Sequence, residues 1–220
     1  IRDLSVSFSS SGETPAVQNV SFSVPDGCTI EYYEVFDHQE KTLPNGCREF
    51  DDGIYTWLYE FSDEGVVIRG YVDDNGLALP CISPLPTGEI VIPGSIRAVV
   101  TNEVWNGESW VAEGDVMTND YPVVSVGDFA FANCSDLTAV AIPATVTTIG
   151  GDAFMNSGIR SIRLPDSVHE ILWCAFLNSA LEEINVPASL GSVGSQVFDG
   201  TPWLSAQGEF PVYGDGFLVA

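Results

Sequence analysis

Two short segments spaced 22 residues apart carry charged and polar side chains at matching positions. The first contains Arg160 and Arg163, and the second contains Glu182, Glu183 and Asn185. If the two segments are neighbouring parallel strands, opposite charges face each other, and an exposed ion pair contributes about 0–1 kcal/mol. The same side chains could instead form a polar recognition strip for a protein ligand. The sequence leaves both interpretations open.

Two tryptophans flank the strongest short hairpin signal in the chain, Asn106-Gly107. A two-residue turn there pairs Trp105 with Glu108. Glu103 then pairs with Trp110, so the two indole rings lie diagonally on one face and can touch. They are expected either to stabilise a protruding hairpin or to form an exposed aromatic platform for a sugar or a protein.

No other residues form a recognisable catalytic, cofactor or metal-binding pattern. The two histidines, His38 and His169, have no second His or Cys at the spacing of a zinc site. Asp73-Asp74-Asn75-Gly76 lacks the closing Glu of a calcium loop and is predicted to be a turn. Nucleophile-elbow, phosphate-loop and dinucleotide motifs are absent. The sequence therefore predicts a non-enzymatic protein without cofactor or metal.

The net charge excludes several classes of partner. Seven basic against 31 acidic residues give a formal charge of −24, which disfavours nucleic acid and anionic lipid surfaces. No run of 18 apolar residues is present, so no membrane span is expected. An acidic surface of this kind serves solubility, or it recruits cations or basic partners. No export signal is visible, and Ile1 is expected to be the start of a trimmed chain.

Five cysteines are an odd number, so at least one thiol is unpaired. Cys28 and Cys47 flank a loop that a disulfide could close, whereas Cys81 has no evident partner. Cys134 and Cys174 are about two coils, or roughly 10 Å, apart at the spacing of paired strands, too far for a disulfide. They are expected to be small buried apolar residues.

The polar segments described first belong to a series of sequence repeats. Four phenylalanines recur at intervals of 23, 22 and 22 residues: Phe131, Phe154, Phe176 and Phe198. Each interval holds a short apolar strand that ends in Ile-Pro, Leu-Pro or Val-Pro, then a second strand, a corner and a helical turn. A fixed period of this length predicts a solenoid, with one phenylalanine per coil in a stacked column.

The repeated phrase resembles a known family. Val126-Gly127…Ala130-Phe131…Cys134, followed by Leu137…Ile142-Pro143, is similar to the BspA-like leucine-rich repeat of bacterial surface proteins. Units at Ile149 and Val193 repeat it, and the lead-in before the first coil is similar as well. The resemblance covers about 100 of 220 residues. It implies a right-handed parallel coil, a secreted or surface-attached location, and binding rather than catalysis.

We therefore predict a mainly β protein with short helical turns. Residues 1–85 are expected to form a β-strand module, either sandwich-like or a β-cap, with a hairpin from Ile54 to Val72. Residues 86–220 are expected to form the solenoid, with its first strand at Ile90–Pro93, a hairpin insertion at about 97–120 and a C-terminal cap at about 199–220.

The expected function is that of a secreted or cell-surface, adhesion-type protein, a monomer that binds a host or neighbouring-cell protein or glycan. Two alternatives remain. One is a carbohydrate-binding module centred on the Trp105/Trp110 hairpin. The other is a structural spacer within a longer surface protein.

Overall fold

The structure is a computed structural model that describes the backbone of residues 4–6, 20–22, 47–100, 103–105, 110–112, 117–207, 212–213 and 217–218, and the side chains of 47–99 and 118–207. Contacts divide the chain into two units, 1–41 and 42–220. In the first unit, β1 (Leu4–Val6) pairs antiparallel with β2 (Val20–Phe22). Two of the predicted N-terminal strands are thus present, and the others lie outside the described residues.

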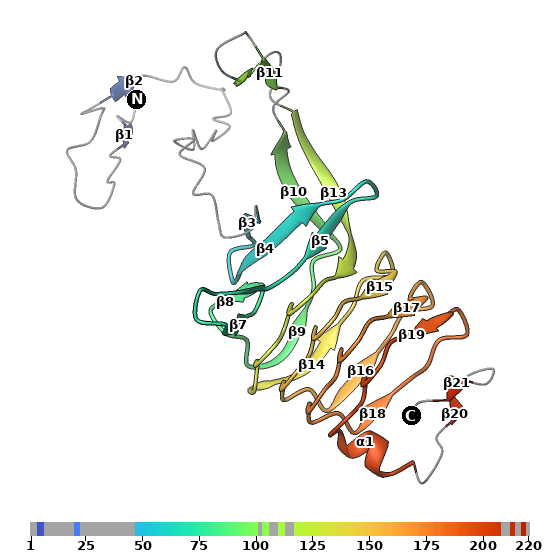
Figure 1. Ribbon diagram of the computed structural model, residues 1–220. Helices are drawn as coiled ribbons and strands as arrows, with labels where there is room; N and C mark the ends of the chain where they lie inside the picture. Colours follow the sequence, from blue (N-terminus) through green and yellow to red (C-terminus); the bar gives the residue numbers. More distant parts are fainter. Residues whose placement is uncertain are drawn as a thin grey trace. The chain divides into compact units, whose positions relative to one another are not determined.

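The second unit contains the coils, and one side of each coil adds a strand to a parallel sheet (Figure 1). Its four strands are β9 (Gly88–Val91), β14 (Leu137–Ala141), β16 (Ser161–Arg163) and β18 (Glu183–Ile184). Equivalent residues are in register, because Val140 pairs with both Ile90 and Ile162. The first strand of the solenoid therefore lies where the sequence predicted it.

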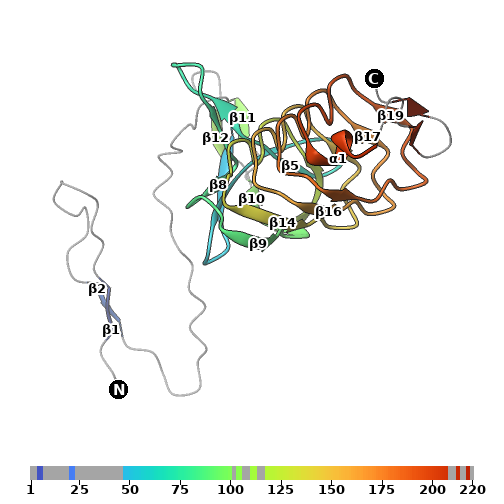
Figure 2. The same cartoon turned by 90° about the horizontal axis from the view of Figure 1, so that it is seen from below.

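The other side of each coil adds a strand to a second sheet. From the last coil backwards its strands are β19 (Ser192–Val193), β17 (Glu170–Ile171), β15 (Thr148–Ile149) and β13 (Met117–Val126), followed by β5 (Val66–Ile68), β4 (Thr56–Phe61) and β3 (Arg48–Asp51). Strands β5 to β19 are parallel, whereas β3, β4 and β5 pair antiparallel. Figure 2 shows β14 and β16 on the opposite side of the coils from β17 and β19.

The predicted hairpin at the start of this unit is present and belongs to the second sheet. Tyr59 pairs with Ile68, and Ser62 N–H donates to Gly65 O at the turn. Because β5 pairs in parallel with β13, residues 47–85 form part of the solenoid sheet. The expected boundary at 85–86 therefore falls inside one unit. The proline-rich stretch expected to be a linker contributes β8 (Ile82–Ser83), which pairs with β4.

One smaller pair of strands completes this region. β6 (Tyr71–Val72) and β7 (Ala78–Leu79) enclose the turn predicted at Asp73. The Asp73 carboxylate accepts the backbone N–H groups of Leu77 and Asn75, at 2.8 and 2.9 Å. These hydrogen bonds, the one from Leu77 first, lower the pKa of Asp73. Its carboxylate therefore holds the turn together.

The predicted insertion is a long antiparallel ribbon. β10 (Ser95–Val100) pairs with β13 from Ser95↔Pro122 to Val100↔Met117. Beyond it, β11 (Glu103–Trp105) pairs with β12 (Trp110–Ala112), and Trp105 lies directly opposite Trp110. The predicted two-residue turn is wrong, because four residues separate this pair. The observed strand register differs from the predicted one by two residues. Because side chains alternate between the two faces of a strand, a shift of two leaves each side chain on the same face, so the residue pattern is consistent with either register.

The segment that closes each coil is a tight turn with two left-handed residues, four positions apart. Three of the second positions are asparagines, Asn133, Asn156 and Asn178, at φ of 54–62°. Asparagine adopts this conformation more readily than most residues, and Asn156 Nδ2 donates to Asn133 Oδ1 at 3.1 Å. The sequence predicted a helical turn here. In the described chain the helix is α1 (Pro202–Ser205), in the predicted C-terminal cap.

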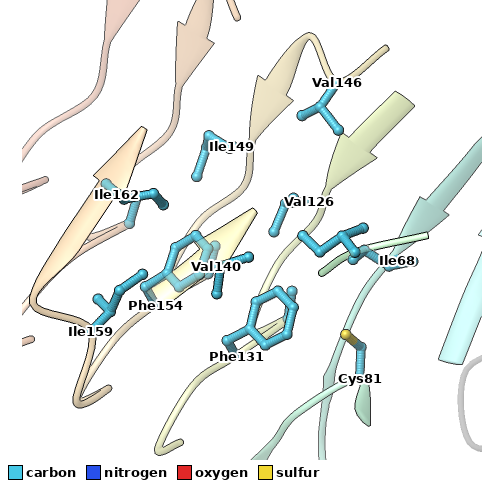
Figure 3. Close-up of a cluster of buried hydrophobic side chains, with 14 of the residues drawn as sticks. Ile68, Cys81, Val126, Phe131, Val140, Val146, Ile149, Phe154, Ile159 and Ile162 are labelled. Carbon is cyan, nitrogen blue, oxygen red and sulfur yellow. The ribbon is translucent and has the colours of Figure 1, made fainter. Parts of the chain in front are cut away.

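The predicted phenylalanine column is confirmed. Successive rings are 5.2, 5.2 and 5.6 Å apart and inclined by 14°, 2° and 7°, and all four are nearly or fully buried. Figure 3 shows Phe131 and Phe154 side by side between apolar residues of the two sheets. Trp57 meets the first ring edge-on at 6.3 Å, and Trp203 lies 4.4 Å from the last. Aromatic residues thus close both ends of the column.

Because Phe154 has a ring on each side, Phe154→Ala should leave a cavity and lower the free energy of unfolding by about 3–5 kcal/mol. Denaturant unfolding measures this loss. The control is Leu85→Ala, since Leu85 is 62% exposed and its truncation should have little effect. Equal losses in the two variants would contradict the column.

Candidate binding surface

The outer side of the four-stranded sheet, called the sheet face below, carries the residues that the sequence placed at open strand positions. Their alternation is regular, because Val140 and Ile162 point inward and are 5% exposed. The outward residues are exposed or half-buried: Glu89, Val91, Thr138, Ala139, Ala141, Arg160, Ser161, Arg163, Glu182, Glu183 and Asn185. The prediction of three open positions in each coil is confirmed.

The last two strands of the sheet face enclose an open hollow of about 340 Å³, lined by Ser161, Ile162, Arg163, Glu183, Ile184 and Asn185. Three of the five charged and polar residues singled out in the sequence therefore line one depression. The other two, Arg160 and Glu182, directly precede β16 and β18. Strand register brings all five together, because Ser161 pairs with Glu183.

One of the predicted ion pairs forms. Arg160 Nη1 lies 3.5 Å from Glu182 Oε1, and the two side chains are 67% and 55% exposed. At such exposure the pair is worth about 0–1 kcal/mol. It joins neighbouring coils without stabilising them strongly.

Asn185 has a structural role. Its Oδ1 accepts the N–H of Leu164 at 2.7 Å, and its Nδ2 donates to the carbonyl of the same residue at 2.8 Å. The side-chain amide thus takes the place of a backbone peptide where β18 ends one residue short of β16. Both of its polar atoms are engaged and contribute to the wall of the hollow.

Arg163 differs from the other arginines that the structure describes. Four of them have partners: Arg48 over the ring of Phe61, Arg69 with Glu60, Arg97 with Asp120, and Arg160 with Glu182. Within the described residues Arg163 has no ion pair and no side-chain hydrogen bond. Across the sheet, Arg163 pairs with Ala141, and Ala141 pairs with Val91 on the next strand. Val91 is 72% exposed. On one side Arg163 adjoins Ala141, and on the other it shares a hollow with Glu183 and Asn185. An unpaired guanidinium in this position can bind a carboxylate of a partner.

The tryptophan pair of the insertion is described by its backbone alone. The register places Trp105 opposite Trp110, and their side chains lie outside the described residues. The aromatic platform therefore stays a prediction.

Sequence reasoning missed a second group of residues at a corner of the coils. Trp173 is 45% exposed, and its ring lies against Gly151, where an added Cβ would be 2.6 Å from Cε2. Gly151 N–H donates to Asp128 Oδ1 at 2.8 Å. The sequence held a signal, since the position three residues before the phenylalanine is Asp128, Gly151 and Trp173 in successive coils. A large residue there needs a glycine in the coil before it.

The neighbouring Asp152 is 6% exposed, and its carboxylate forms no hydrogen bond within the part of the chain that the structure describes. Burial first, and the charge of Asp128 second, raise its pKa. The residue has a left-handed φ of 52° and does not cap a helical turn.

The described cysteines are free thiols. Cys47, Cys81 and Cys134 are buried, and burial raises the pKa of each, to about 12 for Cys134. A thiol with so high a pKa is unreactive at neutral pH. Cys174 is half-buried, so its predicted burial is wrong. The proposed partner of Cys47, Cys28, lies outside the described residues.

Metal and membrane sites were also considered. Among the described residues no three His, Cys, Asp or Glu side chains gather as metal ligands would. In the same part of the chain, no helix has the length and apolarity needed to cross a membrane.

Comparison with known proteins agrees with the fold. Residues 118–207 match the family model described as "BspA type Leucine rich repeat region", in six copies. This part of the chain is thus similar to BspA-type leucine-rich repeats. No curated protein matches the chain.

Solved structures of bacterial leucine-rich repeat proteins also resemble it. One from Bacteroides capillosus is 26% identical over 76% of this chain and 99% of its own, with a TM-score of 0.47. The T. pallidum leucine-rich repeat protein is 26% identical over 64% of this chain, with a TM-score of 0.43. This chain spans about half, 52%, of the T. pallidum protein.

Asn185→Ala removes both hydrogen bonds to Leu164 and should lower the free energy of unfolding by about 1–3 kcal/mol. Ser161→Ala, on the same face, should cost less than about 0.5 kcal/mol. Denaturant unfolding compares the two variants. A loss for Asn185→Ala no larger than that for Ser161→Ala would contradict the structural role.

A second prediction concerns pH. The raised pKa of Asp152 means that the folded protein holds this proton more tightly than the unfolded chain does, so the ionised carboxylate destabilises the fold. Asp152→Asn should therefore raise the melting temperature by about 2–4 °C at pH 7, as for a gain of about 1 kcal/mol. This gain in melting temperature should vanish as the pH falls toward 3.8, the ordinary pKa of an aspartate.

Melting curves of both proteins across this pH range provide the test. Asp166→Asn, at an exposed position, is the control and should leave the melting temperature unchanged. An Asp152→Asn protein that melts lower than the wild type at pH 7 would show that the carboxylate stabilises the fold.

Proposed function

We propose that this is a secreted or cell-surface, non-enzymatic repeat protein of the adhesion type, which binds a protein partner on its sheet face. Arg163 is the central contact, and the hollow between β16 and β18 receives the partner. The observation that carries the proposal is the unpaired guanidinium of Arg163 in a chain of charge −24, where the other described arginines have partners.

The shape of the sheet face supports a protein ligand. Its strands are joined by regular ladders and packed on the phenylalanine column, so the surface is rigid and little ordering entropy is lost on binding. Small side chains at Ala139 and Ala141 leave the middle of the sheet open, with Val91 at one side and Arg163 at the other. Arginine and apolar residues are typical of the centres of protein interfaces.

The type of repeat supports two parts of this proposal, the secreted or cell-surface location and the non-enzymatic character. BspA-type repeats are typical of bacterial surface proteins, and they present surfaces rather than enclosed pockets. The two hollows described in the structure are both open. A host or neighbouring-cell protein is the partner that such a surface fits best.

The test measures binding of the purified chain to a panel of immobilised extracellular proteins by biolayer interferometry. Arg163→Glu should weaken binding to a partner found in this way by about tenfold or more, a loss typical of a central arginine. The matched control is Arg97→Glu, because Arg97 is exposed and its pair with Asp120 lies on the ribbon of β10 and β13.

Unchanged affinity of Arg163→Glu for such a partner would refute the sheet face as the binding site. A chain that binds no protein on the panel, but binds glycans lost on Trp105→Ala, would favour the carbohydrate-binding alternative. A chain that binds neither would favour the spacer.

A further inference from the structure

The corner formed by Trp173, Asp152 and Asp128 has features that the coil alone does not require. The indole of Trp173 is 45% exposed, whereas the four rings of the phenylalanine column are buried. It rests on the backbone of Gly151, where a side chain of any size would collide with the ring. The ring is therefore held flat in one position, with part of its surface open to solvent.

Two aspartates flank Gly151, the residue under this ring, and no described arginine pairs with them. Asp128 Oδ1 accepts the N–H of Gly151, the residue under the indole. Asp152 follows directly, and its amide N–H donates to the carbonyl of Trp173 at 3.1 Å. As a whole residue Asp152 is only 6% exposed. Its carboxylate has no hydrogen-bond partner among the described residues, and it experiences the charge of Asp128.

The nearest described arginine does not neutralise them. Arg69 lines the same hollow as Asp128, and its Nη1 binds both carboxylate oxygens of Glu60, at 3.1 and 3.2 Å. In the described chain no salt bridge reaches Asp128 or Asp152. Two like charges, one of them nearly buried, are therefore held close together at a cost in stability.

We propose that Trp173, Asp152 and Asp128 form a binding site for the cationic side chain of a basic protein segment. A guanidinium or ammonium group over the indole face gains cation–π attraction. The same group satisfies the free carboxylate of Asp152 and removes its repulsion from Asp128. Since no described arginine pairs with these carboxylates, a cationic side chain of the ligand would balance their charge.

The surroundings fit an extended segment. Asp128 also lines an open hollow of about 170 Å³, together with Leu172, Thr148, Ser125 and Glu60. The chain on either side of the bound cation can follow this hollow over the second sheet. The charge of −24 steers basic segments toward the protein and repels acidic ones. A neutral sugar would stack on the indole but would leave the two carboxylates uncompensated.

This site is separate from the sheet face, since its residues follow strands of the other sheet. The partner class is a basic segment, whereas Arg163 on the sheet face accepts an acidic group. The two proposals can therefore fail independently.

The experiment follows the indole N–H signals of ¹⁵N-tryptophan-labelled full-length chain. The chain has five tryptophans, and the signal lost in Trp173→Phe identifies Trp173. The probes are an acetylated hexapeptide of alternating glycine and arginine, and the same peptide with neutral citrulline in place of arginine. Cellobiose tests the sugar alternative.

The arginine peptide should shift the Trp173 signal in a saturable manner, and the citrulline peptide should not. Asp152→Asn should weaken this binding by about tenfold, while remaining folded by its spectrum. The control variant Asp166→Asn should bind as the wild type does. Added salt should weaken the interaction, because part of it is electrostatic.

Three results would overturn the proposal. One is a Trp173 signal that does not respond to the arginine peptide. Another is an equal response to the citrulline peptide or to cellobiose. The third is a response to arginine that Asp152→Asn leaves unchanged.

Discussion

The rings of Phe131, Phe154, Phe176 and Phe198 stack 5.2–5.6 Å apart along the coils, and the two sheets depend on that stack. Paired strands are spaced about 4.8 Å apart, so one ring per coil fills the interior at nearly the same interval as the backbone ladders. A larger or smaller residue would force the ladders out of register. The aromatic residue of each coil therefore fills the core at the interval that the backbone ladders set.

The ends of such a stack need protection, since each terminal ring would otherwise face water. Trp57 lies against the first ring and Trp203 against the last. Trp57 reaches its place through the antiparallel hairpin of β4 and β5, which continues the second sheet. Trp203 reaches its own through α1, which begins at Pro202 after the cap Thr201. Both caps are parts of the solenoid rather than separate modules.

A filled interior leaves the two outer faces for function, and they differ in character. The sheet face carries paired and unpaired charges on regular strands, whereas the corner at Trp173 holds a strained, repelled carboxylate. Residues that reduce stability in this way are often retained for binding. Asp152 is the clearest example here, because an asparagine would keep its shape and remove the repulsion.

The sequence alone determined the coil. The period of the phenylalanines, the alternation around Val140 and Ile162, and the exposure of Arg160, Arg163 and Glu182 all follow from local spacing, and the structure agrees. Only the tertiary structure decided that residues 47–85 join the same sheet, that Trp105 pairs with Trp110, and that Asn185 binds the backbone of Leu164. It also brought Trp173 over Gly151, 22 residues earlier in the chain. The physical reason is that a repeat specifies contacts between equivalent positions that carry similar residues. Most of these contacts join residues that occupy different positions in the repeat or lie outside it, and Trp173 and Gly151 share a position but differ in size.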